Sequence, residues 1–87
     1  MVEEVLFETE QRMERGDIAA MFRQIAESLE SGAPIALSAG EQSIELEVPQ
    51  RPTFEVKAER EGQNELSVEF ELEWREGEGE DTALSIG

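Results

Sequence analysis

Apolar and polar residues alternate without a break in residues 65–74, where the chain reads ELSVEFELEW. Strict alternation over this length is typical of a β-strand with one buried face and one solvated face. The apolar face of this strand would carry Leu66, Val68, Phe70, Leu72 and Trp74. Shorter alternating runs predict further strands at residues 3–10, 34–38, 43–48 and 53–60.

The stretch from residue 14 to residue 32 has the period of a helix instead. Four apolar residues recur there at spacings of four, three and four, and so lie on one stripe: Ile18, Phe22, Ile25 and Leu29. Asp17 stands where a carboxylate caps free amides or meets the helix dipole. Gly32 supplies a left-handed stop, and Pro34 prevents the helix from continuing. We expect the helix to begin between residues 14 and 18.

These elements predict a single α+β domain over residues 1–75. Their order is β-α-β-β-β-β, with an antiparallel meander after the helix and a corner bracketed by Pro49 and Pro52, which cannot donate to a sheet ladder. Every strand alternates, so only one face of the sheet is buried. The expected fold is a two-layer sandwich, with one amphipathic helix on one face of an antiparallel sheet. Residues 76–87 are acidic and glycine-rich, lose all periodicity, and predict a flexible tail.

The charge balance bears on the solvent in which this fold works. The 87 residues hold 22 Asp and Glu against 7 Lys and Arg, a net charge of -15, and Lys57 is the only lysine. Three interpretations compete: a surface adapted to very high salt, a polyanion mimic that binds basic proteins, and an acidic disordered tail. The acid is spread over the helix, the strands and the tail, so a tail alone does not explain it. Dispersed acid with almost no lysine favours the cytosol of a halophile, where molar salt shortens the Debye length to ~3 Å and screens the repulsion.

Several residue types and segments that the chain lacks narrow the range of functions it can have. Without Cys or His, the chain has no disulfide framework, no thiolate chemistry and neither the commonest general base nor the commonest zinc ligand. No apolar run approaches the ~20 residues of a membrane span, and the N-terminal stretch MVEEVLFETE is acidic where a signal peptide is basic. Binding to duplex nucleic acid is disfavoured, because phosphate contacts need clustered Lys and Arg. We therefore expect a cytoplasmic protein.

The solvated face of the sheet gathers carboxylates: Glu45, Glu47, Glu55, Glu59, Glu69, Glu71 and Glu73. Such a cluster can bind a hard cation, although opposed like charges destabilise a sheet. Paired carboxylates also act as general acid and base, but that chemistry needs one carboxyl with a raised pKa in a cleft that excludes water. We expect a hydrated face here, and therefore no enzyme activity, no catalytic residue, no metal site and no cofactor.

Trp74, the only tryptophan, ends the apolar face of the last strand. It is either a plug at the edge of the core or an anchor for a partner, since a large amphipathic ring suits both roles. The strand over residues 65–74 is long and would form an edge, which is either guarded by charge or paired with another chain. Trp74, Leu72 and Phe70 are the candidate interaction residues. A homodimer, or a complex with an unidentified protein partner, is the expected assembly.

These stretches together resemble a known family, the amphi-Trp domain proteins common in haloarchaea. The likeness covers about residues 2–75 and is carried by the helix core, the Ser-Gly end of the helix and the end of the last strand: Ile18, Ala19, Phe22, Ser31, Gly32 and Trp74. The resemblance implies a halophilic archaeal origin and a small α+β domain. It brings no established activity and no catalytic residues.

The charge pattern and the strand alternation leave two classes of function open. The favoured one is a non-enzymatic protein-interaction or adaptor module. The alternative is a small-ligand or cation-binding module that uses the carboxylate-rich sheet face.

If the acid is an adaptation to solvent, the free energy of unfolding should rise steeply with salt, because screening removes repulsion within a chain of net charge -15. Thermal melts between about 0.1 and about 3 M KCl measure this directly. A melting temperature that stays flat across the series would contradict the halophilic interpretation.

Overall fold

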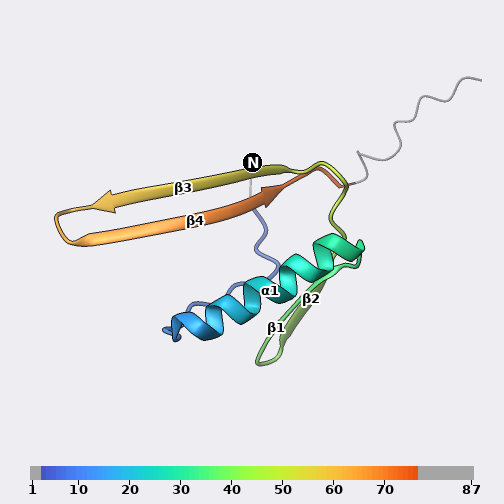
Figure 1. The fold of residues 1–87 in the computed structure, drawn as a ribbon, viewed down its shortest axis with the longest axis horizontal. Helices are drawn as coiled ribbons and strands as arrows, with labels where there is room; N and C mark the ends of the chain where they lie inside the picture. The colour runs from blue at the N-terminus through green and yellow to red at the C-terminus, as the bar shows by residue number, and fades with distance from the viewer. Residues whose placement is uncertain (1–2, 77–87) are drawn as a thin grey trace, which may run out of the picture. The chain divides into compact units, whose positions relative to one another are not determined.

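The computed structural model describes residues 3–76, which form one helix and four strands. In chain order they are α1 (Arg15–Ser31), β1 (Ile35–Ala39), β2 (Gln42–Leu46), β3 (Thr53–Glu61) and β4 (Glu65–Glu73) (Figure 1). The predicted α+β class is confirmed. The chain divides into two compact units, Met1–Val48 and Pro49–Gly87, and each is described by itself.

Helix α1 begins inside the predicted window and ends where glycine was expected to stop it. The Glu14 carbonyl accepts the first bonds, from the Asp17 N–H at 2.9 Å and the Ile18 N–H at 3.1 Å. No side chain caps this end, so Asp17 in the first turn is the acidic group that meets the helix dipole. Gly32 takes the left-handed conformation at φ 79°, which a residue with a Cβ adopts only under strain.

The first unit pairs α1 with a short hairpin formed by β1 and β2. Gly40, at φ 59°, starts a two-residue turn of the kind that closes tight hairpins, and Ile35 lies opposite Leu46 in the register. Ile35 is the one buried hydrophobic side chain of the described chain, at 8% exposure. Ile25 and Ser28 of α1 line the same hollow as Ile35. The core of this unit is therefore one edge of the helix stripe against β1.

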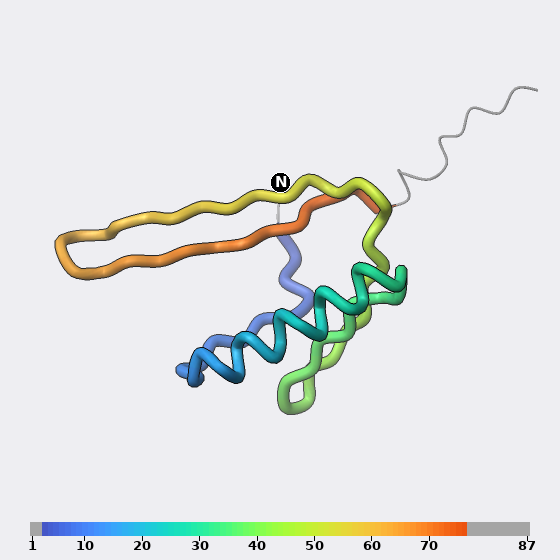
Figure 2. The backbone as a smooth tube through the Cα atoms, viewed as in Figure 1, coloured from blue at the N-terminus to red at the C-terminus, as the bar shows by residue number. Residues whose placement is uncertain are grey.

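The second unit is a longer hairpin, in which nine residues of β3 pair with nine of β4. Gly62, at φ 63°, opens the turn, which lies in the EGQN stretch between the two predicted strands. The tube in Figure 2 follows the two strands side by side along their whole length. The bounds agree with the predicted strands to within one residue, and β4 ends at Glu73, one residue before Trp74.

The N-terminal strand predicted at residues 3–10 does not form, so the element order is α-β-β-β-β. The segment is held by a side chain instead. The Glu8 N–H donates to Oε1 of Gln42 at 3.2 Å, and Nε2 of Gln42 donates to the Glu8 carbonyl at 3.1 Å. One amide side chain thus satisfies both backbone groups that a neighbouring strand would have paired. Alternation alone does not distinguish these two ways of pairing the backbone N–H and C=O groups of an extended segment.

The four strands form two separate two-stranded sheets, β1-β2 and β3-β4, where one continuous meander was expected. Pro49 and Pro52 lie between β2 and β3, and neither has an N–H to carry a ladder across this corner. The stacking of the helix on the whole set of strands stays a prediction, as does the single domain over residues 1–75. The predicted tail at 76–87 lies, apart from Glu76, outside the described residues.

Replacing Ile35 by Ala should lower the free energy of unfolding by about 2–3 kcal/mol, the lower part of the range for large-to-small core changes, because its neighbours are only half buried. Urea unfolding followed by far-UV circular dichroism measures the loss. The matched control is Val5→Ala, at a side chain that is 67% exposed, for which we expect a change within about 0.5 kcal/mol. Equal losses in the two variants would show that Ile35 is not the core of this unit.

Candidate interaction site

The register of β3 against β4 sorts the side chains of the hairpin by polarity. Successive residues of a strand point to opposite faces, so residues two apart share a face. One face carries four cross-strand pairs with a single charged residue among them: Phe54–Leu72, Val56–Phe70, Ala58–Val68 and Arg60–Leu66. We call these eight residues the apolar face.

The apolar face has no second layer within its own unit, which comprises only the two strands and the segments next to them over the described residues. Val56 is 55% exposed and Leu66 is 69% exposed, and Phe54 and Val68 lie between these values. A contiguous apolar surface of this kind marks an interaction site more often than isolated exposed side chains do. A two-stranded hairpin is also marginally stable alone, so covering this face would stabilise it.

The three candidate interaction residues fall in two places. Phe70 lies opposite Val56 and Leu72 opposite Phe54, so both belong to the apolar face. Trp74 lies just beyond the end of β4, is half buried, and lines a hollow at the end of the hairpin.

The alternating run at residues 53–60 predicted a strand, but its apolar residues Phe54 and Val56 were not among the candidate interaction residues. Their cross-strand partners follow from the antiparallel register that the turn at residues 62–64 sets, a signal that the sequence contains. Sequence reasoning also overlooked Arg51 and Arg75, which line the same hollow as Trp74. These two residues are separated by 24 positions, and only the pairing of β3 with β4 brings them to one end.

The opposite face of the hairpin is acidic and holds five cross-strand pairs: Thr53–Glu73, Glu55–Glu71, Lys57–Glu69, Glu59–Ser67 and Glu61–Glu65. Nζ of Lys57 lies 3.9 Å from a carboxylate oxygen of Glu59 and 3.9 Å from one of Glu69. Both ion pairs are well exposed and contribute little stability. Glu45, predicted to share this surface, lies instead on β2 opposite Ala36, in the other sheet.

Glu55 and Glu71 are direct cross-strand partners of like charge. The pKa of the Glu71 carboxyl lies above its ordinary value of 4.5, first because its protonated form hydrogen-bonds to Glu55 and second because the Glu55 carboxylate repels a second negative charge. Slight desolvation, Glu73 and Glu69 raise it further. The Glu71 carboxyl therefore binds a proton more readily than an isolated glutamate does as the pH falls.

The acidic face does not converge on a cation site. Among residues 3–76, no group of three or more acidic side chains is placed to hold a metal ion. Within the same residues, α1 is neither long enough nor apolar enough to cross a membrane.

The described residues thus define a small α+β protein whose notable surface is an amphipathic hairpin next to a tryptophan. The family model of the Amphi-Trp domain matches residues 1–87, the whole chain, and the chain belongs to this family. The match confirms the resemblance and extends it past residues 2–75 to both ends. No function is established for the family. No curated protein and no solved structure matches the chain.

The Glu55–Glu71 pair predicts that the stability of the fold depends on pH, with a definite sign. A carboxyl whose pKa is raised by folding stabilises the fold when protonated, and this contribution is lost as the pH rises through the raised pKa. Glu71→Gln keeps a hydrogen-bond donor toward Glu55 and removes the repulsion. At neutral pH the variant should therefore melt higher than the parent, and the gap should close as the pH falls toward 4.5.

Thermal melts across this pH range measure the difference between the variant and the parent. Glu45→Gln is the matched control, since it removes the same charge opposite Ala36 in the other hairpin. If Glu45→Gln raised the melting temperature as much as Glu71→Gln, the effect would be one of net charge and not of the cross-strand pair.

Proposed function

We propose that the protein is a non-enzymatic interaction module, and that it associates with a second copy of itself through the apolar face of the β3–β4 hairpin. The observation that carries the proposal is that this face is more than half exposed at Phe54, Val56 and Val68 in a unit that has no layer of its own to cover it. The acidic composition then serves a cytoplasmic, high-salt environment in which such association is not opposed by charge.

Charge favours the apolar face over every other surface of this hairpin as the contact. Seven glutamates point from the opposite face, with Lys57 as its only base, and two copies meeting there would bring like charges together. The apolar face holds one charged residue among eight, Arg60. A two-fold contact places the same patch of each copy against the other, which this composition allows without burying carboxylates.

The area of the face predicts a weak association. Nine residues at about 3.3 Å each give a length of about 30 Å, and two paired strands give a width of about 10 Å, so each copy offers about 300 Å². A standard stable interface buries about 800 Å² per partner. We therefore expect a dimer that forms only as the protein concentration rises, and only when salt screens the net charge of -15 on each copy.

The alternative function is cation binding by the acidic face of the hairpin. One feature supports it, the apposed carboxyls of Glu55 and Glu71. Two carboxylates supply fewer oxygens than the six to eight ligands, at about 2.3–2.6 Å, that calcium takes in a protein site. The face therefore supports diffuse counter-ion condensation better than a specific cation site.

Sedimentation equilibrium at molar KCl, over a wide range of protein concentration, tests the self-association. We expect the average mass to rise toward that of a dimer for the parent, and to stay at the monomer for Val56→Glu, which places a carboxylate at the centre of the apolar face.

Ser67→Glu is the control, because it adds the same charge to the same hairpin on the acidic face and should leave the dimer intact. A parent that sediments as a monomer at every concentration, or equal loss in the two variants, would overturn the proposal.

A further inference from the structure

The end of the hairpin that carries Trp74 is hollowed. Eight residues of the second unit line a hollow of about 550 Å³, five from the corner that leads into β3 and three from the end of β4: Pro49, Gln50, Arg51, Pro52, Thr53, Glu73, Trp74 and Arg75. This volume falls within the range of sites that hold a small ligand or a few side chains of a partner. The hollow shares no residue with the apolar face, and its strand residues, Thr53 and Glu73, are a register pair of the opposite face.

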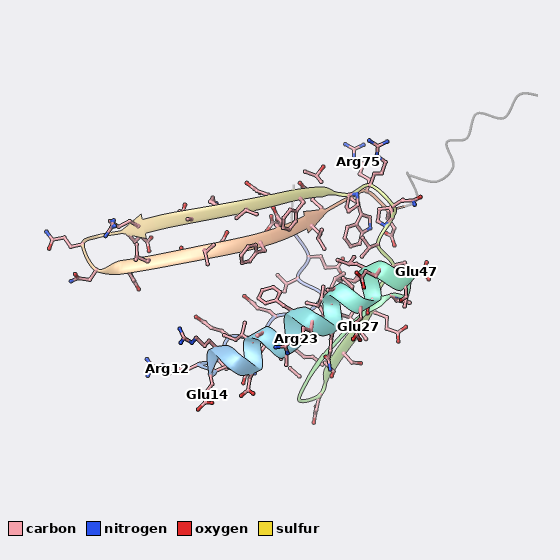
Figure 3. All side chains as sticks on the ribbon, viewed as in Figure 1. Arg12, Glu14, Arg23, Glu27, Glu47 and Arg75 are labelled. Atoms are coloured by element: carbon pink, nitrogen blue, oxygen red, sulfur yellow. The ribbon has the colours of Figure 1, made fainter. Side chains whose placement is uncertain are left out.

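The hollow concentrates positive charge in a chain that is otherwise acidic. Two of the 7 basic residues, Arg51 and Arg75, line it together with one carboxylate, that of Glu73. The ion pairs among the described residues belong to Lys57, and neither arginine takes part in one. Figure 3 shows Arg75 at the end of the hairpin, where β4 leaves the sheet. A guanidinium presents a planar fork of donors that matches a carboxylate, and both arginines are exposed, so their side chains are accessible to an anion.

The wall beside the arginines is apolar and stiff. Trp74, Pro49 and Pro52 line it, and all three are half buried. The two prolines have fixed φ angles, so the wall loses little conformational entropy when a ligand binds. The indole ring offers a flat face for an aromatic or aliphatic side chain and an N–H that can donate to an acceptor. The lining therefore supplies guanidinium donors for an anion and apolar groups for a neighbouring side chain.

We propose that the Trp74 hollow binds an acidic peptide segment, with a carboxylate on Arg51 and Arg75 and a neighbouring apolar side chain against Trp74 and the prolines. A peptide fits the remaining polar groups, since the Gln50 amide and the Thr53 hydroxyl can each donate to and accept from a peptide backbone. A nucleic acid does not fit, because its many phosphates would meet a net charge of -15 with only two arginines in their favour. The same net charge restricts the ligand to a short segment with few acids.

Fluorescence of Trp74, the only tryptophan of the chain, reports directly on this hollow. The probe is the blocked tripeptide Ac-Asp-Phe-Glu-NH2, titrated into the full chain at the lowest KCl concentration at which it stays folded. We expect a saturable shift of the emission. The isosteric neutral peptide Ac-Asn-Phe-Gln-NH2 should bind at least about tenfold more weakly, because it cannot form charge-assisted bonds to the guanidinium groups.

Arg51→Gln and Arg75→Gln should each weaken the binding of the acidic peptide by about tenfold and leave the binding of the neutral peptide unchanged. Arg23→Gln is the matched control: it removes the same charge from α1 (Figure 3) and should have no effect. The comparison of the two peptides uses the parent chain alone, so it does not depend on the folding of any variant.

Equal affinity for the two peptides, the absence of a saturable shift, or an equal loss in Arg23→Gln would overturn the proposal. Val56→Glu distinguishes the two proposals, because it alters the apolar face and not the hollow. If Val56→Glu abolishes the dimer and keeps the peptide affinity, the two surfaces are separate sites. If it abolishes both, the hollow is formed only in the dimer and the proposed independence is wrong.

Discussion

The antiparallel register of β3 against β4 is the constraint on which the other features of the second unit depend. It places Val56 opposite Phe70 and Glu55 opposite Glu71, so that one face is apolar and the other is acidic. A shift of the pairing by one residue would send carboxylates to the apolar face and aromatic rings to water. The turn that opens at Gly62, φ 63°, locks the register, because the left-handed conformation there is accessible to glycine without strain.

The same register explains how an acidic protein can carry an exposed apolar face. With 22 acidic residues in 87, carboxylates are forced into neighbouring positions, and Glu55 beside Glu71 is the direct result. Alternation keeps these charges on one side of the hairpin. Solvent and counter-ions therefore screen the repulsion, and no carboxylate has to be buried. Salt would then act on the two faces differently: it relieves repulsion on the acidic face and, in the proposed dimer, lets two apolar faces approach.

The two units depend on local stabilisation to different degrees. In the first unit, α1 lies against β1 and buries Ile35 to 8% exposure, and Gln42 ties down the preceding segment through Glu8. The second unit has a longer ladder and no buried side chain among its described residues. It is therefore the unit that has most to gain from a partner, and both of the proposed binding surfaces lie on it.

Sequence alone determined the period of each element, and with it the helix at Arg15–Ser31, its end at Gly32 and the four strands that follow. These elements depend on local pattern, turn chemistry and left-handed glycines, all of which are set by residues close together in the sequence. Tertiary structure decided the conformation of residues 3–10. The backbone hydrogen bonds of an extended segment can be made by a neighbouring strand or by a side chain, and here the amide of Gln42, 34 positions from Glu8, makes them. The meeting of Arg51, Trp74 and Arg75 at one hollow was decided in the same way. Residues so far apart in the chain become neighbours only through long-range strand pairing. The polar and apolar pattern of a single segment carries no information about that pairing.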